Sequence, residues 1–261
     1  MIIGLCFKIG AAPFHFWTPD VYDGSPALVT TFMSTVVKTA GFAAFFRLFY
    51  YSFGSLHEFW FPVLLAISIL TLVIGNITAL YQRSFKRMLA YSSISHAGYM
   101  LFAIIALGIN SADAIFLYSI AYTVASIVAF GSLILLRNET GLETIDGFNG
   151  LSKSNPFIAF TLTVSMLSLA GIPLTAGFIG KFMMFSGVMP EGHIWLVIMG
   201  VINAVVGIVY YFRVIIAMYF KDADAEQTVI NVPAYFKIVF VLSAFITIIL
   251  GVYPAVLPSI F

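Results

Sequence analysis

The feature that most constrains this chain is a succession of long, almost uncharged apolar stretches. A helix needs about 20 mostly apolar residues to cross a bilayer. Stretches of this kind cover residues 1–18, 27–50, 60–81, 88–109, 112–136, 156–189, 194–220 and 234–258. Continuous stretches favour helices over the alternating segments of a β-barrel. We therefore predict an all-α integral membrane protein with about eight transmembrane helices.

The composition excludes the soluble classes of protein. Charged residues make up 9% of the 261 residues and hydrophobic residues 61%, with a mean hydropathy of +1.05. About a quarter of the residues of a soluble domain are charged, and a disordered chain has far less apolar surface. The net charge of +1 gives no sign of a nucleic-acid partner or an acidic substrate. We expect residues 1–261 to form a single transmembrane domain in the lipid bilayer, without a soluble domain.

Residues that hold metals or redox clusters are scarce. The single cysteine, Cys6, excludes an internal disulfide framework and a cysteine-ligated cluster held by this chain alone. The four histidines are scattered and none has the spacing of a metal motif. The sequence also lacks a nucleophile–base motif, a phosphate-binding loop and a dinucleotide fingerprint. We therefore predict no metal site and no cofactor bound by this chain.

The positions of lysine and arginine predict the orientation, because cytoplasmic loops are enriched in these residues. The loops at 51–59, 109–113 and 189–193 contain neither residue, and only Arg47 lies near that side. The other side has Arg83, Lys86, Arg87, Arg137, Lys153, Lys221 and Lys237. We predict that the loops at 19–26, 81–87, 137–155 and 221–233 are cytoplasmic, and that the C-terminus lies outside.

Two of the apolar stretches contain helix-breaking residues. The first includes FKIGAAPFHFWTPD, with Pro13 and Pro19, and the sixth includes LSLAGIPLTAGFIGKF, with Pro173. Proline removes a backbone donor and clashes with the preceding turn. Paired interruptions in the two halves of a chain point to a transporter site, although proline and glycine are also generally commoner in membrane helices. We predict two broken helices, near Pro13 and Pro173.

Four basic residues and no acidic residue lie well inside the predicted spans, more than three residues from either end: Lys8, Lys38, Lys181 and Arg213. A lysine at the centre of a spanning helix costs roughly 2.5–3.5 kcal/mol. We expect Arg213 to snorkel to the cytoplasmic interface. Each lysine is either satisfied by snorkelling or by backbone carbonyls, or is a proton site, because burial disfavours the charged form of its ammonium.

A mid-span histidine adds a second kind of titratable group. His96 lies in LAYSSISHAGYMLF, close to Ser92, Ser93, Ser95 and Tyr99. It is either a proton relay in a water-filled interior, or a histidine that bonds to serine or backbone and holds helices together. His15 lies beside the first break and has the same two interpretations.

Three long strings carry a family resemblance: FKIGAAPFHFWTPDVYDGSP, NITALYQRSFKRMLAYSSISHAGYM and LSLAGIPLTAGFIGKF. The chain resembles the antiporter-like membrane subunits of bacterial NADH:quinone oxidoreductase (respiratory complex I), of the subunit N type. HFWTPDVY is similar to the N-type sequence, whereas the M and L subunits and the cation/proton antiporter subunits usually carry a TWLPDA-like sequence there. The resemblance covers essentially the whole chain.

The resemblance implies a fold of fourteen helices with two inverted repeats, of which this chain would be the last eight. It implies that Lys8 is the broken-helix lysine, whose partner glutamate would lie upstream of Met1. Lys38 would be the connecting lysine and Lys181 the terminal lysine of the second broken helix. We also expect the chain to begin inside a longer protein, since its first stretch looks incomplete and lacks the basic region of a signal peptide.

The function implied by the resemblance is proton translocation through a polar axis of buried lysines in the bacterial inner membrane. Electron transfer from NADH to quinone, through FMN and iron–sulfur clusters in other subunits, would drive it. The partners would be other membrane subunits of complex I. One alternative is a subunit of an Mrp-type sodium/proton antiporter, and another is a membrane scaffold whose lysines are only structural.

Overall fold

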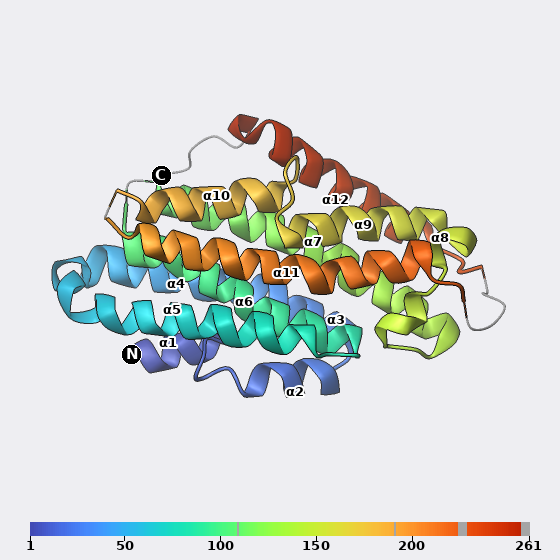
Figure 1. The fold of residues 1–261 in the computed structure, drawn as a ribbon, viewed down its shortest axis with the longest axis horizontal. Coiled ribbons are helices and arrows are strands. Elements are labelled where there is room, and N and C mark those ends of the chain that lie inside the picture. Colours follow the sequence, from blue (N-terminus) through green and yellow to red (C-terminus); the bar gives the residue numbers. More distant parts are fainter. Residues whose placement is uncertain (109, 191, 224–228, 257–261) are drawn as a thin grey trace.

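The computed structural model describes residues 1–108, 110–190, 192–223 and 229–256, and their regular structure is helical apart from one isolated β-bridge (Figure 1). Among these residues, six helical segments are long and apolar enough to cross a membrane: Ala27–Ser52, Gly54–Leu80, Phe85–Ala106, Ser111–Thr140, Ile194–Phe220 and Ala234–Val252. The all-α membrane prediction is confirmed for this part of the chain. The remaining two predicted spans correspond to pairs of shorter helices.

The six long segments consist of the following elements. The first is α3 (Ala27–Phe32), a π-helical turn η1 (Met33–Val37), α4 (Lys38–Arg47) and a second π-helical turn η2 (Leu48–Ser52). The second is the short η3 (Gly54–Leu56) followed by α5 (His57–Leu80). The others are α6 (Phe85–Ala106), α7 (Ser111–Thr140), α11 (Ile194–Phe220) and α12 (Ala234–Val252). Short helices η4 (Ile145–Phe148) and α8 (Leu151–Ser154) lie between α7 and α9, and η5 (Pro254–Val256) follows α12.

Two interruptions fall where proline and glycine predicted them. The first separates α1 (Ile2–Ile9) from α2 (Trp17–Gly24), and the second separates α9 (Pro156–Ala170) from α10 (Ala176–Val188). α1 ends at Gly10 with φ 74°, and α9 ends at Gly171 with φ 82°. Both glycines adopt the left-handed conformation that commonly closes a helix. Each helix therefore stops before its proline is reached.

The prediction of one span over residues 1–18 followed by a loop over 19–26 is wrong in detail. That segment forms two helices of eight residues each, and each is shorter than a membrane crossing. Pro19 lies in the first turn of α2, where proline is tolerated because the first backbone N–H groups have no partner within the helix. Pro19 therefore does not break a helix, and α2 continues through the predicted loop.

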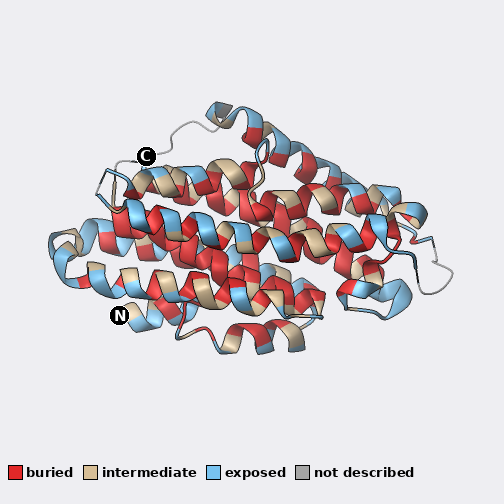
Figure 2. Cartoon of the chain, viewed as in Figure 1, coloured by how far each residue is buried: buried red, intermediate tan, exposed pale blue. Residues whose placement is uncertain are grey.

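The bundle is built around α6, in which nearly every residue is buried (Figure 2). α5 packs along α6, and α2, α7 and α10 contact it from other sides. A Cβ atom at Gly75 of α5 would lie 2.6 Å from the backbone nitrogen of Ser95. Small residues of this kind allow membrane helices to approach closely. This packing removes the polar middle of α6 from the lipid-facing surface.

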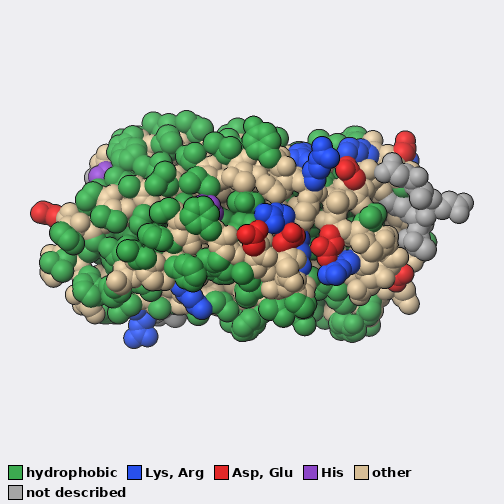
Figure 3. Space-filling model, turned by 90° about the horizontal axis from the view of Figure 1, so that it is seen from below, with side chains coloured by type: hydrophobic (Ala, Val, Ile, Leu, Met, Phe, Trp, Pro, Cys, Tyr) green, Lys and Arg blue, Asp and Glu red, His purple; other side chains and the backbone are tan. Residues whose placement is uncertain are grey.

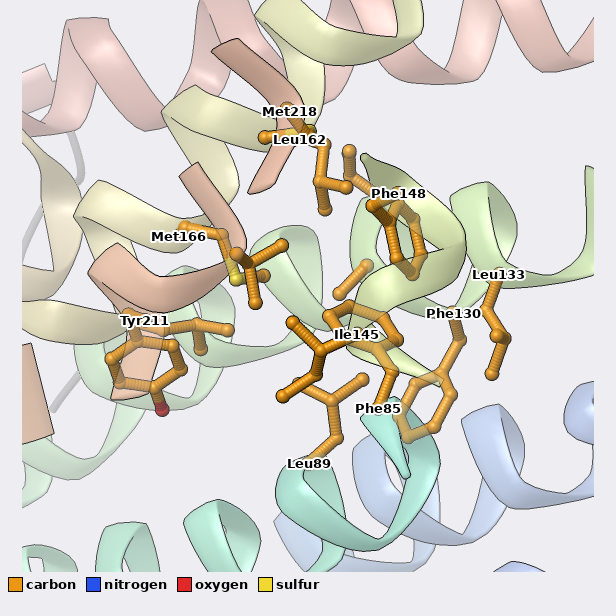
Figure 4. Close-up of a cluster of buried hydrophobic side chains, with 14 of the residues drawn as sticks. Phe85, Leu89, Phe130, Leu133, Ile145, Phe148, Leu162, Met166, Tyr211 and Met218 are labelled. Atoms are coloured by element: carbon orange, nitrogen blue, oxygen red, sulfur yellow. The ribbon is translucent and has the colours of Figure 1, made fainter. Parts of the chain in front are cut away.

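A large apolar core fills the half of the bundle that contains the ends of α6 and α7 near residues 85 and 136 (Figure 4). Phe85 and Phe148 pack there with ring centroids 4.7 Å apart. Leu162 and Met166 of α9 and Met218 of α11 contribute to the same cluster. The core fixes α6, α7, α9 and α11 relative to one another, and thus positions the polar side chains that these helices carry.

The four loops predicted to share one side of the membrane are joined at one end of the bundle. Arg87 pairs with Asp20 at 3.1 Å and with Asp23 at 3.4 Å. Acidic and basic side chains gather on this face of the molecule (Figure 3). The backbone N–H of Phe85 donates to the carbonyl of Glu143. Finally, Lys153 pairs with Asp222 at 2.7 Å. These contacts link the loops at 19–26, 81–87, 137–155 and 221–233, each to the next.

The pair between Lys153 and Asp222 also affects protonation at this end of the bundle. The hydrogen bond from Lys153, and then its positive charge, lower the pKa of the Asp222 carboxyl. Both side chains are largely exposed, so the pair contributes little stability.

Candidate functional site

Lys38 is buried in the middle of the bundle, with 4% of its surface exposed. It is the first residue of α4, directly after the π-helical turn η1. Its ammonium donates to the carbonyl of Ser93 at 2.6 Å and also contacts the Ser93 hydroxyl. Single π-helical turns are frequent at functional sites because they displace the side chains that follow. The turn thus directly precedes the lysine whose side chain reaches Ser93 in the middle of α6.

Lys181 is buried to a similar degree, with 5% of its surface exposed. Its ammonium donates to the carbonyls of Leu169 and Ala170, at 3.0 and 2.8 Å. These carbonyls are free because α9 ends at Gly171 and the last turn of a helix has no partners for them. The ammonium also lies 5.0 Å from the centre of the Tyr99 ring. A cation at a helix C-terminus is favoured by the helix dipole, so the broken helix provides a site for this charge.

No carboxylate pairs with either lysine among the described residues. The ion pairs in this part of the chain all lie at the loop end of the bundle. The ammonium groups of Lys38 and Lys181 are instead held by backbone carbonyls and, for Lys38, a hydroxyl. The carbonyl-satisfied geometry that the sequence left open is therefore present at both positions. It leaves each ammonium without a fixed counter-charge.

His96 lies between the two lysines in the interior and is 3% exposed. Its Nδ1 is 2.6 Å from the hydroxyl of Tyr118 on α7, and its Nε2 is 2.9 Å from the hydroxyl of Tyr211 on α11. The Tyr211 hydroxyl also hydrogen-bonds to Ser92. Hydroxyl groups both donate and accept, and a neutral imidazole does the same through its two nitrogens. The row Ser92–Tyr211–His96–Tyr118 is therefore able to pass a proton in either direction.

The two ends of this row approach the two lysines. At one end, Ser92 is adjacent in sequence to Ser93, the partner of Lys38. At the other end, Tyr118 packs against the residue before Lys181, since a Cβ atom at Gly180 would lie 2.5 Å from the Tyr118 ring. The interior thus places a row of polar groups near both lysines, although no hydrogen bond joins the row to either lysine among the described residues.

The sequence did not identify the hydrogen-bond partners of His96. It predicted serines and Tyr99 nearby, whereas Tyr118 and Tyr211 make the contacts. A tyrosine in an apolar helix normally needs a partner for its hydroxyl when it is buried. That signal was available at both positions, but the chain has 13 tyrosines and only the fold selects these two.

A second buried polar cluster, formed by Asn76, Asn203 and Tyr210, was not predicted from the sequence. The Asn76 amide on α5 donates to the Leu72 carbonyl at 3.0 Å and lies 3.4 Å from the Asn203 side-chain oxygen on α11. The Tyr210 hydroxyl donates to the Asn76 oxygen at 3.0 Å. Polar pairs of this kind join helices in membrane proteins. The cluster ties α11 to α5 and so orients the neighbouring Tyr211.

The structure differs from the expectation for Lys8, which is exposed rather than buried. Its stem lies near Gly41 of α4, where an added Cβ atom would be 3.7 Å from the Lys8 Cγ. A cavity of about 400 Å³ is lined by Lys8, Lys38, Trp17 and Tyr22, among others. Lys8 and Lys38 thus border one hollow, although they are not in contact.

Arg213 and two further histidines, His57 and His15, lie outside the polar row. In the described part of the chain, Arg213 and His57 contact backbone carbonyls, and His15 Nδ1 has no hydrogen-bond partner. Arg213 is half-buried and donates to the carbonyl of Leu80 at 2.6 Å, so it reaches the end of α5, as snorkelling predicted. His57 lies 2.9 Å from the Ile105 carbonyl. His15 is 7% exposed, and its Nδ1 has no hydrogen-bond partner among the described residues.

Comparison with known proteins agrees with the resemblance. A sequence model of the transmembrane family "NADH:quinone oxidoreductase/Mrp antiporter" matches residues 1–207. NADH-quinone oxidoreductase subunit N of Trichlorobacter lovleyi is 44% identical over 98% of this chain and 53% of its own length. Subunit N of Cytophaga hutchinsonii is 40% identical over 99% of this chain and 56% of its own length. The chain thus spans about half the length of the curated relatives it matches.

Solved structures have the same fold. A chain of respiratory complex I from Thermus thermophilus, with bound aureothin, has a TM-score of 0.83 and 34% identity over 97% of this chain and 55% of its own length. With its several membrane-length helices, this multi-pass membrane protein belongs to the NADH:quinone oxidoreductase/Mrp antiporter family and is similar throughout to subunit N.

Proposed function

We propose that this chain is part of a proton-translocating membrane subunit of NADH:quinone oxidoreductase. The observation that carries the proposal is the buried series of polar groups between Lys38 and Lys181. An intramembrane ionisable residue is costly and marks an ion or proton route in many membrane proteins. Two such residues, with a hydrogen-bonded row of groups that both donate and accept protons close to each of them, fit a proton route better than a structural role.

The proposal assigns a role to each lysine. Lys38 is a relay, since it contacts the middle of α6 and borders the cavity shared with Lys8. Lys181 is the terminal site, from which a proton leaves or enters towards a neighbouring subunit. His96 passes protons between them. Lys8 is the switchable site, and its exposed side chain is available for a carboxylate that the described residues do not provide.

The wider setting is part of the proposal. The chain would be the last eight helices of a fourteen-helix fold, forming one transmembrane domain with the end of the chain on the outer side of the bacterial cytoplasmic membrane. Electron transfer from NADH to quinone would occur in other subunits, which hold FMN and iron–sulfur clusters. Its partners would be the adjacent membrane subunits of the complex.

An Mrp-type antiporter subunit is the alternative in the same family. A structure of the Mrp complex from Dietzia sp. DQ12-45-1b has a TM-score of 0.87 with only 18% identity over 98% of this chain and 56% of its own length, so that likeness shows the fold alone. The higher identity to subunit N favours complex I. Co-purification of the full-length protein with NADH-oxidising, iron–sulfur-containing subunits supports complex I, and its absence supports the antiporter.

The test of proton translocation uses Lys38→Ala and Lys181→Ala in the full-length protein within its assembled complex. Proton uptake and NADH:quinone activity are measured in inside-out membrane vesicles. We expect both rates to fall about tenfold or more, because a positioned proton-transfer group contributes about 10²–10⁴-fold to a rate. Assembly, followed by native gel electrophoresis, is expected to survive.

The matched control is Lys237→Ala, since Lys237 is exposed in the first turn of α12 and far in sequence from the polar row. It is expected to leave both rates unchanged. Normal proton uptake in an assembled Lys38→Ala complex would overturn the role of Lys38 and support the scaffold alternative.

A further inference from the structure

A groove of about 710 Å³ runs between α4 and the N-terminal half of α7. It lies at the opposite end of the bundle from the four joined loops, because α7 ends in one of those loops. Thr39 and Ser119 line its inner end, and Tyr50 and Tyr51 line its mouth. The twelve steps along the chain from Thr39 to Tyr51 correspond to about 18 Å of helix. This length is comparable with one leaflet of a hydrocarbon core about 30 Å thick.

The walls between these ends are apolar. Ala43 and Phe46 form the wall on α4, and Ile115 and Phe116 form the wall on α7. Ala43 is exposed and Phe46 is half-buried, so the groove is open along the side of the chain. Neither aspartate nor glutamate lines it. A groove of this kind at membrane depth accepts a hydrocarbon chain, since water gains few hydrogen bonds there.

One cation borders the groove near its mouth. Arg47 ends α4 and its side chain is exposed. No carboxylate pairs with it among the residues that the structure describes. A guanidinium matches the geometry of phosphate oxygens through paired N–H groups. The tyrosines beside it are typical of the interface between hydrocarbon and headgroups.

We propose that this groove binds an anionic phospholipid, with its phosphate at Arg47 and one acyl chain between α4 and α7. The unpaired charge selects an anion, and the apolar walls below it select a lipid over free phosphate. The length of the groove fits a chain from the leaflet at that end of the bundle. This inference goes beyond the proposed function and does not depend on it.

The bound chain would also separate lipid-exposed surface from the polar interior. Thr39 directly follows Lys38, and Ser119 directly follows Tyr118. The inner end of the groove is therefore next to Lys38 and to Tyr118, one end of the polar row. An acyl chain there excludes water from the side of the bundle at the depth where the row lies.

The experiment measures lipid retention by the full-length protein. Wild type and variants are reconstituted with equal amounts of phosphatidylglycerol and phosphatidylcholine and washed stepwise with detergent, and retained lipid is identified by mass spectrometry. Arg47→Gln is expected to weaken retention of phosphatidylglycerol about fivefold, because a basic residue near the membrane surface contributes about that factor. Ala43→Trp, which fills the groove, is expected to abolish retention at this site.

Matched controls separate binding from folding. Arg83→Gln removes an arginine from the other end of the bundle, and Ala44→Trp places the same bulk on the adjacent exposed residue, which does not line the groove. Both are expected to retain lipid as wild type does, and thermal unfolding checks that all four variants fold. Retention of phosphatidylglycerol equal to that of wild type in both Arg47→Gln and Ala43→Trp overturns the proposal. Equal retention of both lipids by wild type also overturns it. So does a structure of the full-length protein in which other residues of the protein fill this groove.

Discussion

At the scale of single residues, the two buried lysines are held by backbone carbonyls and not by a carboxylate in the part of the chain that the structure describes. The ammonium of Lys181 has no carboxylate partner among the described residues and donates to the carbonyls of Leu169 and Ala170. These carbonyls stabilise the charged form, while burial disfavours it. Under the proposed function, this balance makes Lys181 a proton site whose occupancy responds to a charge that arrives nearby. A permanent ion pair would instead fix the lysine in one protonation state.

Tyr211 gives the sharpest test at this scale. Tyr211→Phe removes the hydroxyl that joins Ser92 to His96 but keeps the ring. It leaves two buried polar groups without that partner, at about 1–3 kcal/mol, and interrupts the row. We expect proton uptake by the assembled complex to fall about tenfold or more. Proton uptake in inside-out vesicles measures this effect.

The control for this substitution is Tyr219→Phe on the same helix, since Tyr219 is 40% exposed and lies outside the row. It is expected to have no effect on proton uptake. If both variants pump equally well, the row through Tyr211 does not carry protons.

At the scale of elements, the end of α9 shapes the site of Lys181. Gly171 has φ 82°, and a Cβ atom there would lie 2.8 Å from the Lys181 Cδ. The helix end therefore needs glycine both for its backbone conformation and for the space that the lysine occupies. Gly141 closes α7 with a similar φ of 72°, but nothing lies within 4 Å of its Cβ position.

This difference allows a paired prediction. Gly171→Ala and Gly141→Ala both introduce a left-handed alanine, at roughly 1–2 kcal/mol of stability each. Only Gly171→Ala displaces Lys181 from its carbonyls, so only this variant is expected to lose proton uptake. Thermal unfolding and proton uptake, measured on both variants, separate the two effects. Equal uptake by the two variants would contradict the role of this helix end.

Most elements could be predicted from the sequence, because apolar length and charge determine where a membrane helix ends. The predicted span 194–220 coincides with α11, since a polar residue stands at each border, His193 and Lys221. The first segment was less predictable, because the aromatic run around His15 hides a turn within an apolar stretch. The contacts of His96 could not be predicted, since its partners Tyr118 and Tyr211 lie 22 and 115 residues away.

At the scale of the whole molecule, the joined loops predict how the chain lies in the membrane. Leu142 belongs to a joined loop, whereas Leu56 lies at the other end, and both are exposed. Cys6 is fully buried, so it contributes little background to thiol labelling. We expect a membrane-impermeant maleimide to label Leu56→Cys from outside the cell and Leu142→Cys only in inverted vesicles. The reverse pattern would contradict the orientation.

The central claim is that Lys38 and Lys181 serve one route in series. The most direct test is the number of protons taken up per NADH oxidised by vesicles that contain the full-length protein as Lys38→Met, Lys181→Met or both. A single route predicts that each substitution alone lowers this ratio and that the double variant is no worse than the more affected single variant. Additive losses in the double variant, or an unchanged ratio in the single variants, would contradict it.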